Sequence, residues 1–253
     1  MDGLIFYDCN CVFGRKKQAF AYDDLNKDKL IGQLKKVNVE RAVVSHTAQQ
    51  FLSVKRGNEI LLSKIKNDDI FIPAAAVMPN AAGEFMEISE FDTFVQTNGI
   101  KMIKMYPKTQ NFSASEWQMG ELYSYFEKKR LPLMVSIEEV GADGLYGMLS
   151  NHPALRVICT DCGFSNDRDM MRLMEIFQNL YLETGTFYTH GGIEYVVEKF
   201  GAQRLLFGTN LQHAEPGAAA ARILYADITE SEKRKIAYEN MKTMLGQVGG
   251  ECK

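Results

Sequence analysis

Eight short apolar segments of strand type alternate with amphipathic segments along the chain, and no other feature constrains the fold as strongly. The strand-type segments cover residues 4–8, 41–46, 70–77, 100–106, 131–137, 155–161, 180–185 and 204–210. The amphipathic segments cover residues 30–37, 59–65, 85–95, 119–129, 169–177, 193–200 and 217–226. Strands that alternate with helices predict a parallel sheet, and near-continuous apolar strands indicate that both faces of the sheet are covered.

Two parallel-sheet folds are compatible with this pattern, and the sequence favours one of them. Eight strand–helix pairs in 253 residues match the size of a (β/α)8 barrel. The alternative is a doubly wound open sheet, but no glycine-rich phosphate loop follows the first strand. We therefore predict an α/β fold, a (β/α)8 TIM barrel with an extra C-terminal helix from about residue 230. Because no linker or change of composition interrupts the chain, residues 1–253 are predicted to form a single domain.

The composition argues against several classes of partner and location. A formal net charge of −3 and scattered Lys and Arg residues give no reason to expect nucleic acid or a membrane surface as a partner. No apolar run approaches the ~18 residues of a membrane span. The N-terminal sequence MDGLIFYD is unlike a secretion signal, and five cysteines are an odd number for a disulfide framework. A cytoplasmic protein with reduced thiols is the resulting prediction.

Four of the cysteines occur as two close pairs, which raises the question of a structural zinc site. Cys9 and Cys11 lie near the N-terminus, and Cys159 and Cys162 lie near the end of the sixth apolar segment. If that segment is extended, Cys159 and Cys162 are expected on opposite faces, which would prevent them from sharing a metal. Free thiols are therefore favoured over zinc ligands.

Polar side chains gather where the strand-type segments end. They are Asp8, Asn10, His46, Lys104, Tyr106, Ser136, Glu138, Asp161, Glu183, Thr184, Asn210, Gln212 and His213. In (β/α)8 barrels the catalytic residues come from the C-terminal ends of the strands. Polar groups at such positions cost burial energy unless they are paired or used, so their number indicates a functional site.

Six segments resemble motifs of one known family. They are GAQRLLFGTN (201–210), IFYDCNCVFG (5–14), IKMIKMYP (100–107), LPLMVS (131–136), CTDCG (159–163) and YENMKTMLG (238–246). In this order along the strands they are similar to motifs of the amidohydrolase superfamily, specifically its amidohydrolase-2 branch of decarboxylases and lactonase-like enzymes. The resemblance runs the whole length of the chain and implies a TIM barrel with its site at the strand ends.

The resemblance fails at the positions that hold the metal in this family. Its members typically bind a divalent metal through two His on strand one, a His on each of strands five and six, and an Asp on strand eight. The corresponding positions here are Asn10, Val12, Ser136, Asp161 and Asn210. Zinc prefers His, Cys and carboxylate ligands, so we predict no metal and no cofactor.

An oxygen-only site for magnesium or calcium is an alternative. Its ligands would be Asp8, Glu138 and Asp161 with the amide oxygens of Asn10 and Asn210. Lys104 is expected at the same end of the barrel and argues against such a site, because the positive charge of Lys104 would compete with the cation.

We interpret the chain as a metal-independent hydrolase of a small polar carbonyl compound of the lactone, amide or sugar-acid type. The resemblance supports this, because some family relatives, lactonases among them, work without a metal. Lys104 is predicted to polarise the carbonyl, Asp161 to activate water, and Glu138, with Glu183 as the alternative, to protonate the leaving group. The predicted substrate-binding residues are Asp8, Asn10, Tyr106, Ser136, Glu183, Asn210 and His213. Asp8 is also expected to orient Lys104.

Two other interpretations stay open. Lys104 and Asp161 could form a buried ion pair that fills the space left by the metal. The barrel could also hold a small polar metabolite without turning it over. In each case a small molecule is the predicted partner, and the 13 Met, 15 Phe and 11 Tyr residues favour a homo-oligomer.

Overall fold

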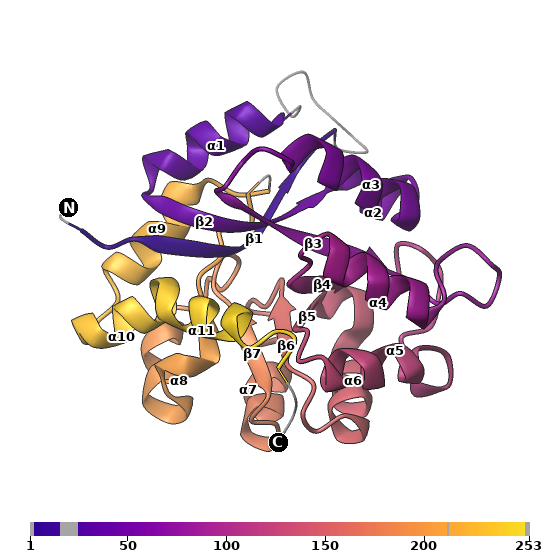
Figure 1. Ribbon diagram of the computed structural model, residues 1–253. Coiled ribbons are helices and arrows are strands. Elements are labelled where there is room, and N and C mark those ends of the chain that lie inside the picture. Colours follow the sequence, from indigo (N-terminus) through magenta and orange to yellow (C-terminus); the bar gives the residue numbers. More distant parts are fainter. Residues whose placement is uncertain (1–2, 16–24, 212, 251–253) are drawn as a thin grey trace.

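Eight parallel strands form a nearly closed barrel in the computed structural model, which describes residues 3–15, 25–211 and 213–250 (Figure 1). The strands are β1 (Phe6–Phe13), β2 (Val39–His46), β3 (Phe71–Val77), β4 (Met102–Met105), β5 (Leu133–Ser136), β6 (Val157–Thr160), β7 (Leu180–Glu183) and β8 (Leu205–Leu206). Each strand pairs in parallel with the next one along the chain. The predicted (β/α)8 TIM barrel is confirmed.

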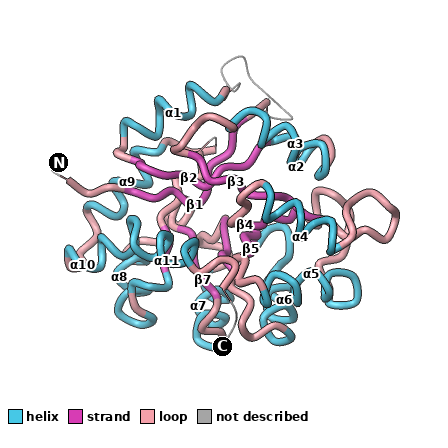
Figure 2. Tube along the Cα trace, viewed as in Figure 1, coloured by secondary structure: helices cyan, strands magenta, loops and turns pink. Residues whose placement is uncertain are grey.

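Helices connect the strands and cover the outside of the barrel (Figure 2). They are α1 (Lys27–Lys36), α2 (Thr47–Phe51), α3 (Val54–Ile65), α4 (Ile88–Thr97), α5 (Glu116–Lys128), α6 (Ile137–Asn151), α7 (Asp167–Ile176), α8 (Gly192–Phe200), α9 (Pro216–Leu224), α10 (Glu230–Arg234) and α11 (Asn240–Gly246). The sequence pattern did not predict α6, because Gly141, Gly144 and Gly147 weaken its helical signal. Gly141 has a φ of 70° and kinks this helix.

Side chains alternate between the barrel interior and the helical layer, as the pleat of a strand requires. In β4, Met102 packs in the interior apolar cluster, whereas Ile103 packs in the outer cluster under the helices. Lys104 has the same parity as Met102, so its side chain points into the barrel. The same alternation places Met134 of β5 and Ile158 of β6 in the interior cluster.

The barrel closes between its first and last strands through a few specific contacts. The N–H of Cys9 donates to the carbonyl oxygen of Phe207 at 2.9 Å, and the N–H of Val12 donates to that of Leu211 at 2.6 Å. Cys11 and Leu211 form an isolated parallel bridge. Strand β8 proper is only two residues long, so this seam depends on the loop that follows it as well as on the strand.

The predicted C-terminal helix is confirmed and closes the N-terminal end of the barrel. It consists of α10, a π-helical turn (Lys235–Glu239) and α11. Met241, Met244 and Leu245 of α11 pack in the interior apolar cluster. At the opposite end, where the strands terminate, no such helix covers the barrel interior among the described residues.

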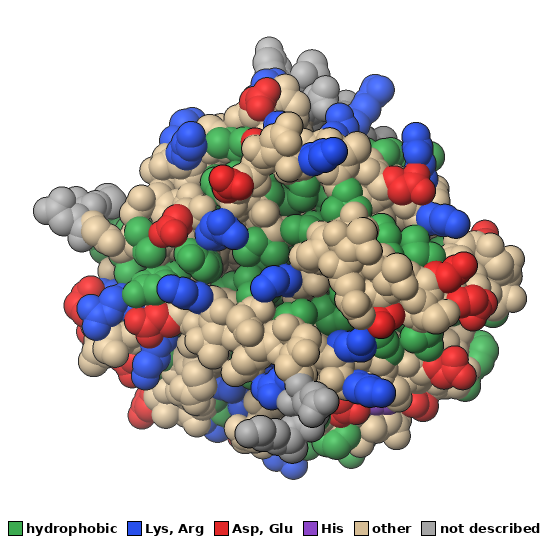
Figure 3. Space-filling model, viewed as in Figure 1, with side chains coloured by type: hydrophobic (Ala, Val, Ile, Leu, Met, Phe, Trp, Pro, Cys, Tyr) green, Lys and Arg blue, Asp and Glu red, His purple; other side chains and the backbone are tan. Residues whose placement is uncertain are grey.

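The surface is mixed in character. Figure 3 shows Lys, Arg, Asp and Glu side chains interspersed with apolar ones on one face. Among the described residues, no helix is long and apolar enough to cross a membrane.

Candidate functional site

A cavity of about 370 Å³ opens at the C-terminal ends of the strands. Its lining comprises Asn10, Val12, Gln50, Phe51, Lys104, Met105, Tyr106, Met134, Val135, Ser136, Glu138, Glu139, Thr160, Asp161, Asn210 and His213. Of the residues predicted to act in catalysis or substrate binding, all line this cavity except Asp8 and Glu183. The strand-end residue Gln212 lies outside the described residues. The barrel therefore brings together side chains that are far apart in the sequence.

Lys104 supplies a buried cation to the cavity. Its side chain is only 6% exposed, and its Nζ donates to Asn10 Oδ1 at 2.8 Å and to Ser45 Oγ at 3.2 Å. Burial lowers the pKa of Lys104, while the thiols of Cys11 and Cys9 and then the nearby carboxyl groups oppose this shift. The ammonium is thus held by two neutral oxygens.

Ser45 is a contact that the sequence analysis missed. It lies one residue before the end of β2 and has the same parity as Val43, which packs in the interior cluster. That parity was the available signal, because every second residue of a strand faces the same side.

Asp161 lies just beyond β6 and lines the cavity together with Lys104. Its backbone has a φ of 58°, a left-handed conformation that Asp tolerates better than most residues. The hydroxyl of Thr160 donates to Asp161 Oδ2 at 3.1 Å. Both residues are described, and no ion pair joins Asp161 to Lys104 among the described residues. The alternative of a buried Lys104–Asp161 pair is therefore wrong for this structure.

Asp8 belongs to the seam of the barrel, below the cavity. Its carboxylate accepts hydrogen bonds from the N–H of Thr209 at 3.0 Å, from Thr209 Oγ1 at 2.5 Å and from the N–H of Asn10 at 2.9 Å. Burial raises the pKa of Asp8, and these hydrogen bonds oppose the shift. The hydrogen bonds of Asp8 go to Thr209 and Asn10 and none goes to Lys104, so the expectation that Asp8 orients Lys104 by a direct hydrogen bond is wrong. The Lys104 charge still acts to lower the pKa of Asp8, against the larger effect of burial.

Glu183 lies inside the barrel and does not line the cavity. It is fully buried, and its Oε1 accepts a hydrogen bond from the N–H of Gly185 at 2.5 Å. Its Oε2 has no hydrogen-bond partner among the described residues. Burial raises the pKa of Glu183 to about 8, and the charges of Asp8 and Asp161 act in the same direction. A Cβ atom at Gly185 or Gly208 would overlap the Glu183 side chain, so these glycines make room for it.

The fifth strand ends in a helix cap that also forms part of the cavity wall. Ser136 Oγ accepts a hydrogen bond from the N–H of Glu138 at 3.1 Å and caps α6. Glu138 is exposed in the first turn of this helix. The neighbouring Glu139, which the sequence analysis did not single out, accepts hydrogen bonds from the N–H of Thr109 at 2.9 Å and from its hydroxyl at 2.5 Å.

Tyr106, Asn210 and His213 complete the predicted set on the cavity wall. Burial raises the pKa of Tyr106, so its phenol remains protonated. Asn210 adopts a left-handed φ of 48° within the seam, between Phe207 and Leu211, which both bond to β1. His46 does not line the cavity; its Nδ1 accepts a hydrogen bond from the N–H of Ala48 and caps α2.

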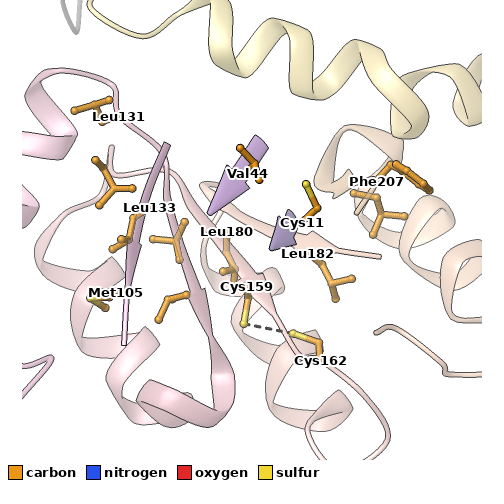
Figure 4. Close-up of a cluster of buried hydrophobic side chains, with 14 of the residues drawn as sticks. Cys11, Val44, Met105, Leu131, Leu133, Cys159, Cys162, Leu180, Leu182 and Phe207 are labelled. Carbon is orange, nitrogen blue, oxygen red and sulfur yellow. Dashed lines mark hydrogen bonds between the residues drawn. The ribbon is translucent and has the colours of Figure 1, made fainter. Parts of the chain in front are cut away.

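The four described cysteines are buried free thiols, as expected, although the arrangement of Cys159 and Cys162 differs from the expectation. Figure 4 shows Cys159 beside Cys162, and their sulfur atoms are 3.4 Å apart. The two thiols do not lie on opposite faces, because β6 ends at Thr160 and the chain turns at Asp161. Within the described ranges, no three His, Cys, Asp or Glu side chains are placed to share a metal ion.

The comparison with known proteins is consistent with this fold. No functionally curated protein matches the sequence. A 2,6-dihydroxybenzoate decarboxylase from Rhizobium superposes with a TM-score of 0.76 at 15% identity, covering 96% of this chain and 99% of that chain. A dihydroxybenzoic acid decarboxylase from a Polaromonas species, solved with bound manganese and 2-nitroresorcinol, gives 0.75 at 14% identity, covering 96% and 97%. A 5-carboxyvanillate decarboxylase from Sphingomonas paucimobilis gives 0.72 at 11% identity, covering 96% and 99%.

These identities are low, so the solved structures establish the fold but carry no substrate over to this chain. The sequence itself gives the more direct assignment, since a sequence model described as amidohydrolase matches residues 23–247. That match covers most of the barrel, from the residues before α1 to the end of α11. The chain therefore belongs to the amidohydrolase family.

Proposed function

We propose that the protein hydrolyses a small polar carbonyl compound of the lactone, amide or sugar-acid type without a metal ion. The observation that carries this proposal is the environment of Lys104. An ammonium group has three N–H donors, and Asn10 and Ser45 accept from two of them. The third is left for a ligand in the cavity that Lys104 lines, and no carboxylate among the described residues is paired with the charge.

Lys104 would act on the carbonyl oxygen. As water adds to the carbonyl carbon, negative charge develops on this oxygen, and a fixed cation stabilises it more than it stabilises the ground state. The low exposure of Lys104 strengthens the effect, because charges interact more strongly where water is excluded.

Asp161 and Glu138 would handle the protons. The Asp161 carboxylate takes a proton from the attacking water as the new C–O bond forms. The bond between the carbonyl carbon and the leaving oxygen or nitrogen then breaks, and Glu138 donates a proton to that leaving atom. For a lactone the net reaction is the addition of one water molecule to give a hydroxy acid.

The site's donor set does not fit the divalent metal of the family. Asn10 and Asn210 offer neutral amide oxygens, Val12 offers no donor atom, and the Oδ1 of Asn10 already accepts a hydrogen bond from the Lys104 ammonium. A cation placed beside Asn10 would face this positive charge. The proposed reaction therefore uses no metal ion.

The test is a panel of sugar-acid lactones, pyrone lactones and small amides, assayed with and without a chelator. Lys104→Met should lower turnover about 10²–10³-fold, because it removes the oxyanion partner. Asp161→Asn should lower it about 10²–10⁴-fold, because it removes the base. Lys108→Met, at an exposed lysine after β4, is the matched control and should leave turnover unchanged.

Two outcomes would replace the proposal. Turnover of 2,6-dihydroxybenzoate that depends on added Mn²⁺ would establish a metal-dependent decarboxylase instead. A compound that raises the melting temperature but is not consumed, with the shift abolished by Lys104→Met, would establish a binding barrel without catalysis.

A further inference from the structure

A second hollow lies at the other end of the barrel, where the strands begin. It has a volume of about 330 Å³ and is bounded by the first residues of β1 to β3, by the turn before β4 and by the C-terminal end of α11. Its charged lining residues are Arg41, Lys101 and Lys242, and none of the described acidic residues lines it. A concentration of positive charge here is unexpected, because the chain as a whole has a formal net charge of −3.

Arg41 is the most informative of these cations. It is half-buried on β2 beside Tyr7 of β1 and has the parity of Val43, whose side chain faces the barrel interior. A guanidinium group carries five N–H donors that are costly to leave unsatisfied away from water. Among the described residues, Arg41 has no hydrogen bond or ion pair.

Each of the other buried or half-buried arginines among the described residues donates hydrogen bonds to at least one acceptor. Arg130 donates to Gln247, Arg156 to Met244 and Gln247, Arg204 to the carbonyl oxygens at the end of α7 and the start of β7, and Arg222 to Thr184 and Gly185. Arg41 is the exception within the described part of the chain. Its fork is therefore available to a ligand in the hollow.

Lys101 and Lys242 add two exposed charges at the rim, and neither is paired within the described residues. The floor is apolar, with Phe71, Ile72, Pro73 and Leu245. In Figure 3, Lys and Arg side chains lie beside apolar surface in the region of α11, with some Asp and Glu side chains nearby. A guanidinium fork matches the oxygens of a phosphate or carboxylate, and two further ammonium groups favour a dianion over a monoanion.

We propose that this hollow binds an organic phosphate monoester, with the phosphate held by Arg41, Lys101 and Lys242 and the organic group resting on the apolar floor. Its volume lies at the lower end of the ~300–1,000 Å³ of small-molecule sites. The site is separate from the cavity at the mouth and does not depend on the activity proposed there.

The experiment is a calorimetric titration at low ionic strength with phenyl phosphate, inorganic phosphate, benzoate and phenol. Phenyl phosphate should bind most tightly, phenol should not bind, and added salt should weaken binding. Arg41→Ala should weaken phenyl phosphate binding about tenfold to a hundredfold. Lys101→Ala and Lys242→Ala should each weaken it about two- to fivefold, because their charges are exposed.

Controls separate a binding role of Arg41 from a structural one. Arg168→Ala, at an exposed arginine on α7, should leave binding unchanged. The ligand-free melting temperature of Arg41→Ala should stay close to that of the wild type, since the substitution breaks no hydrogen bond or ion pair among the described residues. Phenyl phosphate binding that Arg41→Ala leaves unchanged, or no binding at millimolar concentration, would overturn the site. Equal binding of inorganic phosphate would overturn the role of the apolar floor.

Discussion

Glu183→Gln should remove a large part of the pH dependence of folding. The carboxyl group is fully buried, with one oxygen bonded to the N–H of Gly185 and the other without a partner among the described residues. Glutamine reproduces the shape and neutrality of the protonated acid, and its Oε1 can accept the same hydrogen bond. The substitution therefore removes the titration while preserving the packing.

The magnitude follows from the shift of the pKa from 4.5 to about 8. Because the folded-state pKa is the higher one, the native chain holds a proton that the unfolded chain releases. The stabilisation from this proton is fully present below pH 4.5 and is lost as the pH rises through about 8. At about 1.4 kcal/mol for each pKa unit, the wild type should lose about 2 kcal/mol between about pH 6 and pH 8 from this group alone.

The assay is urea unfolding of the wild type and of Glu183→Gln across this pH range. The difference in unfolding free energy between them isolates Glu183, because the other titrating groups are common to both. This difference should move by about 2 kcal/mol in favour of the variant as the pH rises. Glu198→Gln, at an exposed carboxylate on α8, is the control and should give a constant difference. A constant difference for Glu183→Gln as well would refute the argument that the buried carboxyl is protonated.

Three further predictions concern the seam, the interior and the mouth. Thr209→Val should lower the unfolding free energy by about 1.5–3 kcal/mol, measured by urea unfolding, because the buried Asp8 carboxylate loses its hydroxyl donor. Gly208→Ala should lower the unfolding free energy by about 1–3 kcal/mol, because the added methyl group overlaps the Glu183 side chain. In a Glu183→Ala background this loss should largely disappear, and equal losses in the two backgrounds would contradict the contact. If Lys104 acts as an ammonium, kcat/KM should fall with rising pH, and the midpoint of this fall should lie below 10.5 because burial lowers the pKa of Lys104. If Lys104→Arg leaves the midpoint unchanged, another group is responsible for the titration.

The sequence by itself determined the fold and the end of the barrel where the polar residues meet. Alternation of apolar strands with amphipathic helices is a local property of the sequence, so it can be recognised without knowing which strands are neighbours in the sheet. The sequence also predicted the C-terminal helix. It did not predict α6, because the three glycines of α6 weaken the helical pattern. The single-domain organisation and the homo-oligomer remain predictions.

Only the tertiary structure decided which strand-end residues face the cavity. A change of register by one residue turns a side chain to the other face, and the register of β1 is irregular between Asp8 and Cys11. Asn10 consequently faces the Lys104 ammonium, while Asp8 is committed to the seam. Ser45 shows the same limit, because its partner Lys104 comes from β4. The burial of Glu183 also depends on distant segments, since Gly208, just after β8, makes room for its side chain. Residue type and spacing do not encode such distances; the packing of eight strands around one axis sets them.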